Sequence, residues 1–166
     1  MIASTWHSHF ATPLGVMRAT TDGRSILALA FDAPVVDAMV AVPDEPRTLL
    51  ASLRRQLDEY FAGQRTAFEL PLAPAGTPFQ RDVWRVLCTV PYGRTASYAQ
   101  IALQVGSPAA VRAVGAANGR NPIAIVIPCH RIIGSNGTLT GYAGGLDRKR
   151  KLLSLEAPVP FSRQAA

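Results

Sequence analysis

Apolar and polar positions near the N-terminus form three short runs that are separated by turn signals. Residues 4–10, 16–21 and 25–31 are rich in apolar side chains. Thr12-Pro13-Leu14-Gly15 separates the first two runs, and Asp22-Gly23, a strong hairpin signal, separates the second and third. This pattern predicts three strands joined by tight turns.

A helical period follows the three runs. Apolar side chains recur about every 3.6 residues, at Leu50, Leu53, Leu57, Tyr60 and Phe61. We therefore predict a helix that begins at Thr48 and ends at Gly63, where glycine is favoured after the last turn. Residues 66–70 predict one more strand, and the proline-rich residues 71–76 predict a linker.

The second half of the chain is patterned for helices. Thr77-Pro78-Phe79-Gln80 contains a capping box with proline at the first helical position, which predicts a helix to Val90. Ser97 and Gln100 form a second capping box. The helix that it begins is predicted to end at Gly106.

A third helix is expected directly after this glycine. Ser107-Pro108 predicts its start, and residues 118–119 predict its end. Two short helices joined by a Gly-Ser turn, the second rich in alanine, are typical of a helix-turn-helix, although an ordinary helical hairpin has the same pattern. We predict an α+β fold: a small antiparallel-sheet lobe at residues 1–75, and a mainly helical lobe at 76–166.

Composition and charge narrow the function classes. The chain has 166 residues, of which 48% are hydrophobic and 17% charged, which excludes a disordered protein. It has no apolar run of membrane-spanning length and no signal-peptide pattern at its N-terminus, so we expect a cytoplasmic protein. Residues 1–80 carry a net charge of −2 and residues 81–166 a net charge of +8. The basic half indicates a polyanion partner, with nucleic acid favoured.

Two cysteines, Cys88 and Cys129, occur without any CxxC pair, so we expect no disulfide framework, no metal site and no cofactor. Cys88 lies in an amphipathic helix and is interpreted as a small buried side chain. Cys129 follows the apolar residues 122–127, which predict a buried strand, and it lies in Pro128-Cys129-His130-Arg131.

A cysteine nucleophile must become a thiolate, and therefore needs a base or a cation beside it. His130 is adjacent, but neighbouring strand residues point to opposite faces, so the pair cooperates only if the chain turns there or a water bridges them. Residues 134–137 are rich in turn formers. Glu156, at the end of a basic helix over residues 148–155, is the candidate that orients the imidazole, because a carboxylate in an apolar context needs a partner.

These residues alone are compatible with a DNA-binding regulator or with a cysteine hydrolase of the Cys-His type. A more specific resemblance covers the whole C-terminal lobe. Ile127-Pro128-Cys129-His130-Arg131-Ile132-Ile133 resembles the active-site signature of the methylated-DNA–protein-cysteine methyltransferases, which repair 6-O-alkylguanine. The remaining similar motifs are Tyr60-Phe61-Ala62-Gly63, Thr77-Pro78-Phe79-Gln80, Val90-Pro91-Tyr92-Gly93, Arg112-Ala113-Val114-Gly115, Asn118-Gly119-Arg120-Asn121-Pro122 and Thr140-Gly141-Tyr142-Ala143-Gly144-Gly145.

The N-terminal lobe is similar to the family more weakly, mainly in Thr12-Pro13-Leu14-Gly15, and the resemblance implies a ribonuclease-H-like lobe there. It also implies roles for four residues of the C-terminal lobe. Cys129 matches the alkyl acceptor, and His130 matches the residue that takes its proton through a water. Glu156 matches the acid that orients His130, and Asn121 matches the amide that braces the active-site loop.

The resemblance further implies contacts with alkylated double-stranded DNA, made by a monomer. Tyr98 matches a tyrosine near the target phosphate and base, and Arg112 matches a finger that fills the place of a flipped nucleotide. Ser107 and Ser135 match phosphate contacts. The residues that match the guanine pocket are Tyr142, Ala143, Gly144 and Ile132, with alanine at 143 where some relatives carry serine. The implied reaction is a single, irreversible transfer from 6-O-methylguanine or 4-O-methylthymine to Cys129.

Overall fold

The computed structural model describes residues 4–34 and 41–157, which form two compact units. The first unit contains the described residues up to 75 together with Pro122–Ala124. The second contains Gly76–Asn121 and the chain from Ile125 onward. None of the described helices is long and apolar enough to cross a membrane.

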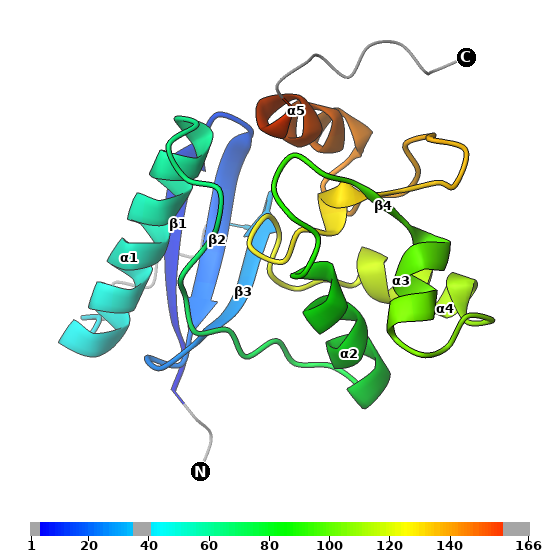
Figure 1. Ribbon diagram of the computed structural model, residues 1–166. Helices are drawn as coiled ribbons and strands as arrows, with labels where there is room; N and C mark the ends of the chain where they lie inside the picture. Colours follow the sequence, from blue (N-terminus) through cyan, green and yellow to red (C-terminus); the bar gives the residue numbers. More distant parts are fainter. Residues whose placement is uncertain (1–3, 35–40, 158–166) are drawn as a thin grey trace. The chain divides into compact units, whose positions relative to one another are not determined.

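The first unit is built on a three-stranded antiparallel sheet, as the turn pattern predicted. Its strands are β1 (Trp6–Thr12), β2 (Gly15–Thr21) and β3 (Ile26–Phe31), with β2 in the centre. Gly23 closes the turn between β2 and β3 with a φ of 91°, which glycine reaches without steric cost. Helix α1 (Asp44–Phe61) packs against β1 and β2 (Figure 1).

Helix α1 begins at Asp44, earlier than the predicted start at Thr48. Asp44 and Glu45 lie in its first turn, where negative charge is favourable at the positive end of the helix dipole. Pro46 is tolerated in the same turn, because the first N–H groups of a helix have no partner within the helix. Most of the predicted apolar face is buried, with Leu50, Leu53, Leu57 and Tyr60 at most 6% exposed, while Phe61 is only partly buried.

The strand predicted at residues 66–70 does not form. The side chain of Gln56 takes the place of a partner strand. Its Nε2 donates to the Glu69 carbonyl at 3.0 Å, and its Oε1 accepts from the Glu69 N–H at 2.8 Å. At Glu69, the backbone thus pairs with a buried amide on α1 and not with a neighbouring strand.

The strand predicted at residues 122–127 is also wrong, although the segment is largely buried. Ile123 forms only an isolated parallel bridge with Leu29 on the outer edge of β3. Ile125 then turns the chain with a φ of 70°, a rare value for a β-branched residue. The apolar run indicated burial correctly, but periodicity cannot separate a strand from a buried turn.

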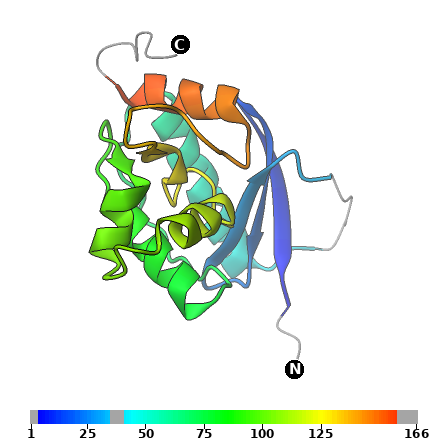
Figure 2. The same cartoon turned by 90° about the vertical axis from the view of Figure 1, so that its right-hand side faces the viewer.

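The second unit is mainly helical. Its helices are α2 (Pro78–Leu87), α3 (Tyr98–Gln104), α4 (Val111–Gly119) and α5 (Leu146–Glu156). The short 3₁₀ helix η1 (Cys129–Arg131) leads into β5 (Ile132–Ile133), which pairs in parallel with β4 (Ala96–Ser97). Helices α2, α3 and α4 pack against one another (Figure 2).

Both predicted capping boxes are present, at Thr77 with Gln80 and at Ser97 with Gln100. Helix α2 nevertheless ends at Leu87 rather than at Val90. Cys88, which we expected to be buried, is its exposed C-cap.

The helix pair α3–α4 is joined by a glycine turn, as predicted. Gly106 has a φ of 82°, and the N–H of Ser107 returns to the Ala102 carbonyl at 2.9 Å, a Schellman motif. Helix α4 begins at Val111 and not at Pro108. Residues 107–110 instead form a separate turn, closed by a hydrogen bond from the Ala110 N–H to the Ser107 carbonyl.

Candidate active site around Cys129

A tight turn presents Cys129. Pro128 has φ −84° and ψ 59°, and the Cys129 N–H donates to the Ile127 carbonyl at 2.8 Å, which is an inverse γ-turn. The chain continues into η1 instead of an extended strand. The condition set by the sequence, a turn at Cys129 and His130, is therefore met.

Asn121 braces this turn from the end of α4. Its Nδ2 donates to the Ile127 carbonyl at 2.8 Å and to Cys129 Sγ at 3.0 Å. Burial raises the pKa of the Cys129 thiol, while the Asn121 hydrogen bond and the charge of Lys149 act in the opposite direction. The resting side chain is therefore a thiol, with donors in place that favour its thiolate.

His130 and Glu156 form the second part of the site. His130 Nε2 lies 2.7 Å from Glu156 Oε1, and both side chains are almost completely buried. Burial lowers the pKa of His130, and this outweighs the opposing effect of Glu156. The neutral imidazole donates Nε2–H to the carboxylate, which leaves Nδ1 as an acceptor. No described protein group hydrogen-bonds to Nδ1.

Arg131 is a part of the site to which the sequence analysis assigned no role. Its Nε donates to Glu156 Oε2 at 2.8 Å, and its Nη2 donates to Oε1 at 3.0 Å. Its Nη1 donates to the Val90 carbonyl at 2.7 Å, and its guanidinium lies 5.9 Å from the centre of the Tyr92 ring. Burial raises the pKa of Glu156, but the hydrogen bonds and charges of His130 and Arg131 outweigh it and lower the pKa to about 2.

Lys149 is a second residue that the sequence analysis missed, since it was interpreted only as part of a basic helix. Its side chain is completely buried, and Nζ donates to the carbonyls of Ile132, Thr140 and Gly141. Burial lowers its pKa to about 8. Helical spacing was the available signal, because positions 149, 152, 153 and 156 share one face of a helix.

The four expected pocket residues lie on β5 and on the loop before α5. Ile132 is buried in β5, and the Gly144 carbonyl accepts a hydrogen bond from Arg148 at 3.2 Å. Ala143 is exposed. The Tyr142 hydroxyl is buried without a hydrogen-bond partner among the described residues, and burial together with the nearby Cys129 raises its pKa. An unpaired buried hydroxyl next to the cysteine is suited to a polar ligand group.

The four expected DNA-contacting residues are not joined to the cysteine by hydrogen bonds of their own side chains. Tyr98 begins α3, and its hydroxyl donates to the Thr140 carbonyl at 3.0 Å. Arg112 is exposed on α4, Ser107 lies in the turn before it, and Ser135 is exposed in the turn after β5. The described residues contain no cluster of three His, Cys, Asp or Glu side chains that could hold a metal ion.

Comparison with known families decides between the interpretations that the sequence left open. Residues 78–158 match the family described as "6-O-methylguanine DNA methyltransferase, DNA binding domain". Residues 6–74 match "6-O-methylguanine DNA methyltransferase, ribonuclease-like domain". The chain belongs to this family. The similar curated proteins are named methylated-DNA–protein-cysteine methyltransferases, which supports this activity over a hydrolase or a regulator without chemistry.

Individual relatives agree over most of the chain. It is 46% identical to a methylated-DNA–protein-cysteine methyltransferase of Methanosarcina acetivorans, over 91% of this chain and 97% of that protein. It is also similar to the crystal structure of the Mycobacterium tuberculosis O6-methylguanine methyltransferase, with a TM-score of 0.78 and 42% identity over 92% of this chain and 93% of that one. A crystal structure of Mycobacterium tuberculosis OGT in complex with DNA matches with a TM-score of 0.81 and 43% identity, over 93% and 96%.

Proposed function

We propose that this methyltransferase repairs alkylated DNA by moving the alkyl group from 6-O-methylguanine to its own Cys129, once per molecule. The observation that carries the proposal is the set of two hydrogen-bonded pairs around the thiol, Asn121 with Cys129 and His130 with Glu156. Asn121 contacts Sγ at 3.0 Å, and the adjacent His130 is bound to Glu156 at 2.7 Å. A nucleophile, a base and an orienting acid are thus present in one buried site.

The proposed reaction moves one proton and one methyl group among the Cys129 thiol, a water, His130 and the guanine. The Cys129 thiol gives its proton through a water to His130 Nδ1, and the thiolate sulfur attacks the methyl carbon. A sulfur–carbon bond forms and the carbon–oxygen bond breaks, with its electron pair going to the guanine oxygen. The proton passes from His130 to the guanine, which remains in the DNA strand as the unmodified base. The thioether on Cys129 has no easy leaving route, so the protein is consumed.

The lesion must leave the base stack, because a buried cysteine cannot reach a base inside a duplex. We infer that Tyr142, Ala143, Gly144 and Ile132 line the pocket for the flipped base. The buried Tyr142 hydroxyl supports this, since it lacks a protein partner among the described residues and lies near Cys129. The same pocket is proposed to accept 4-O-methylthymine, which presents its methyl group on an equivalent exocyclic oxygen.

We propose double-stranded DNA as the partner and a monomer as the binding form, in the cytoplasm. Residues 76–166 would bind DNA and accept the alkyl group, and residues 1–75 would form the ribonuclease-H-like lobe. The DNA-bound crystal structure of the Mycobacterium tuberculosis relative supports the DNA partner. Tyr98, Arg112, Ser107 and Ser135 are the proposed contacts, with Arg112 entering the vacated stack. The net charge of +8 over residues 81–166 predicts that affinity falls steeply with salt.

The test is the stoichiometry of transfer from a methylated duplex. Wild-type protein mixed with excess lesion should repair one equivalent and stop, and the peptide that contains Cys129 should gain the mass of one methylene. Cys129→Ser should bind DNA but transfer nothing. Cys88→Ser is the matched control and should stay fully active. Turnover beyond one equivalent, or methylation at Cys88, would contradict the proposal.

Base flipping has its own test. Arg112→Ala should slow repair of a lesion in duplex DNA more than repair of the free modified base, because the free base needs no extrusion. Equal losses on the two substrates would remove Arg112 from the flipping step while leaving the assignment of Cys129 intact.

A further inference from the structure

Arg131 makes more polar contacts in the buried site than its neighbours in η1. It forms two hydrogen bonds with Glu156, at 2.8 and 3.0 Å, and a third with the Val90 carbonyl at 2.7 Å. The side chain is 8% exposed, and the carboxylate that it binds is 1% exposed. Paired bonds of this kind fix the plane of a carboxylate as well as its charge.

The same carboxylate is the partner of the imidazole. Glu156 Oε1 receives both the Arg131 Nη2–H and the His130 Nε2–H, while Oε2 receives the Arg131 Nε–H. Three charged groups act on His130: Glu156 favours its protonated form, while Arg131 and Lys149 oppose that form. In a buried site such charges are only weakly screened, so the balance among them decides whether His130 is neutral.

From this geometry we propose that Arg131 is a positioning residue that keeps His130 a neutral base by neutralising and orienting Glu156. Its fork holds Oε1 toward Nε2, which sets the tautomer with the proton on Nε2. Nδ1 therefore remains the acceptor for the Cys129 proton. This role rests on the proposed function, and it adds a fourth group to the three that act in the transfer step.

Removal of Arg131 should change the protonation of His130. With no guanidinium, Glu156 carries an uncompensated charge whose nearest cationic partner is the imidazole, so the pKa of His130 should rise. An imidazolium cannot take the thiol proton, and the transfer rate should therefore fall on the acid side. The predicted signature is a shift of the acid limb of the pH–rate profile to higher pH.

The experiment combines an NMR titration with single-turnover kinetics. The chain has three histidines, and His7→Gln and His9→Gln assign the His130 imidazole signals. In Arg131→Met the titration of His130 and the acid limb should both move up by about one pH unit or more. Because the imidazole also loses the fixed orientation that the Arg131 fork gives to Glu156, transfer at neutral pH should fall by roughly ten- to a hundredfold. Arg131→Lys keeps the positive charge but not the paired hydrogen bonds of the guanidinium. It should restore the wild-type titration of His130 and restore the transfer rate only in part.

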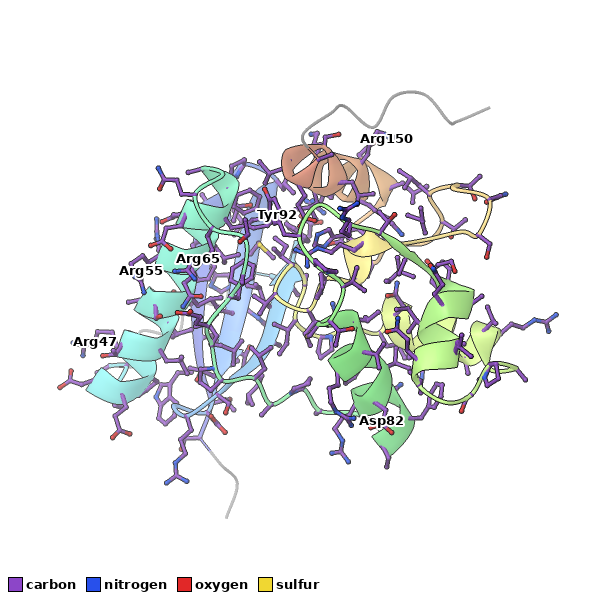
Figure 3. All side chains as sticks on the ribbon, in the orientation of Figure 1. Arg47, Arg55, Arg65, Asp82, Tyr92 and Arg150 are labelled. Carbon is purple, nitrogen blue, oxygen red and sulfur yellow. The ribbon has the colours of Figure 1, made fainter. Side chains whose placement is uncertain are left out.

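Arg65→Met is the matched control. Arg65 also binds a carboxylate, Glu59, through Nε at 2.6 Å, and a backbone carbonyl, that of Ala67, through Nη1 at 2.8 Å. It lies in the first unit next to Arg55, which shares Glu59 (Figure 3). This variant should leave both the His130 titration and the transfer rate unchanged.

An unchanged His130 titration in folded Arg131→Met would overturn the proposal. If that variant does not fold, Arg131→Gln tests the same point, because it removes the charge and keeps a donor for the Val90 carbonyl. The titration needs no DNA and no transfer. It therefore still tests Arg131 if wild-type protein fails to methylate Cys129, a result that would count against the proposed function alone.

Discussion

Asn121 does two tasks with one amide group. The Nδ2 that donates to Cys129 Sγ also donates to the Ile127 carbonyl, one residue before the turn at Pro128. The same atom therefore fixes the backbone that presents the thiol and places a donor beside the developing negative charge on sulfur. An isosteric change at this position separates hydrogen-bond donation from shape.

We predict that Asn121→Asp reduces the single-turnover transfer rate by roughly 100-fold or more. An aspartate has no N–H to give, and its charge would oppose the thiolate. Asn136→Asp is the control, because the Asn136 Oδ1 only accepts, from the Thr138 N–H and hydroxyl, and aspartate can do the same. Rates of transfer for both variants over a range of pH check the prediction. Similar losses in the two variants would count against it.

The lowered pKa of Glu156 makes the stability of the protein depend on pH. Its pKa in the folded protein is about 2, against an ordinary value of 4.5, because His130 and Arg131 stabilise its charge. A lowered folded pKa stabilises the native state above about pH 4.5, and this contribution is lost as the pH falls toward 2. The shift corresponds to about 3 kcal/mol at neutral pH.

The free energy of unfolding of wild type should therefore exceed that of Glu156→Gln at pH 6, and the gap should narrow below pH 4.5. Asp147→Asn, which breaks an exposed ion pair with Arg150 on the outer face of the same helix, is the control (Figure 3). The free energies of unfolding of wild type and Asp147→Asn should differ little at every pH. Denaturant unfolding at several pH values measures both gaps, and a pH-independent gap for Glu156→Gln would refute the argument.

At the scale of elements, helix α5 carries the charges that the site needs on its buried face. Lys149, Leu152, Leu153 and Glu156 are all buried, while Arg150 and Lys151 are exposed. Lys149 ties this helix to β5 and to the loop that contains Tyr142, through the carbonyls of Ile132, Thr140 and Gly141. Tyr98 at the start of α3 donates to the Thr140 carbonyl as well, so α3, α5 and the loop meet at one oxygen.

Lys149→Met should destabilise the protein by roughly 2 to 4 kcal/mol, because the Ile132 and Gly141 carbonyls lose the Lys149 donor and the Thr140 carbonyl keeps only the Tyr98 hydroxyl. The effect should be largest in the loop, so amide hydrogen exchange over residues 134–145 should become faster than in wild type. Lys151→Met, on the exposed face of the same helix, should change neither the stability nor the exchange. Equal exchange in the two variants would show that Lys149 does not anchor the loop.

At the scale of the whole molecule, the proposed chemistry alters the protein that performs it. Cys129 is 5% exposed, and its sulfur already contacts Asn121 at 3.0 Å. A methyl group bonded to this sulfur would crowd the Asn121 amide, and a thioether accepts hydrogen bonds poorly. The spent protein should consequently be less stable than the fresh one.

We expect methylated protein to lose roughly 1 to 3 kcal/mol of stability through overpacking. Thermal melting of spent against fresh protein measures the difference, and protein incubated with unmethylated duplex and then freed of DNA is the control. An unchanged melting temperature after complete methylation would refute the packing argument and leave the transfer reaction untouched.

The sequence alone determined the local features that depend on interactions between residues close together in the chain. The capping boxes at Thr77 and Ser97 and the glycine turn at Gly106 each involve groups a few residues apart, so their patterns could be interpreted without a fold. Apolar periodicity located α1 and its buried face. Cys129, His130 and Glu156 were selected as candidates from residue chemistry, and the motif added the family and its expected roles.

Only the tertiary structure decided the partners of buried polar groups. The Gln56 side chain binds the backbone at Glu69, where a strand was predicted. Arg131 and Lys149 belong to the site because their hydrogen-bond partners lie on other elements. Arg131 meets Glu156 across 25 positions and Val90 across 41. A buried charge must find a partner, but which partner it finds depends on packing, and local sequence patterns do not contain that information.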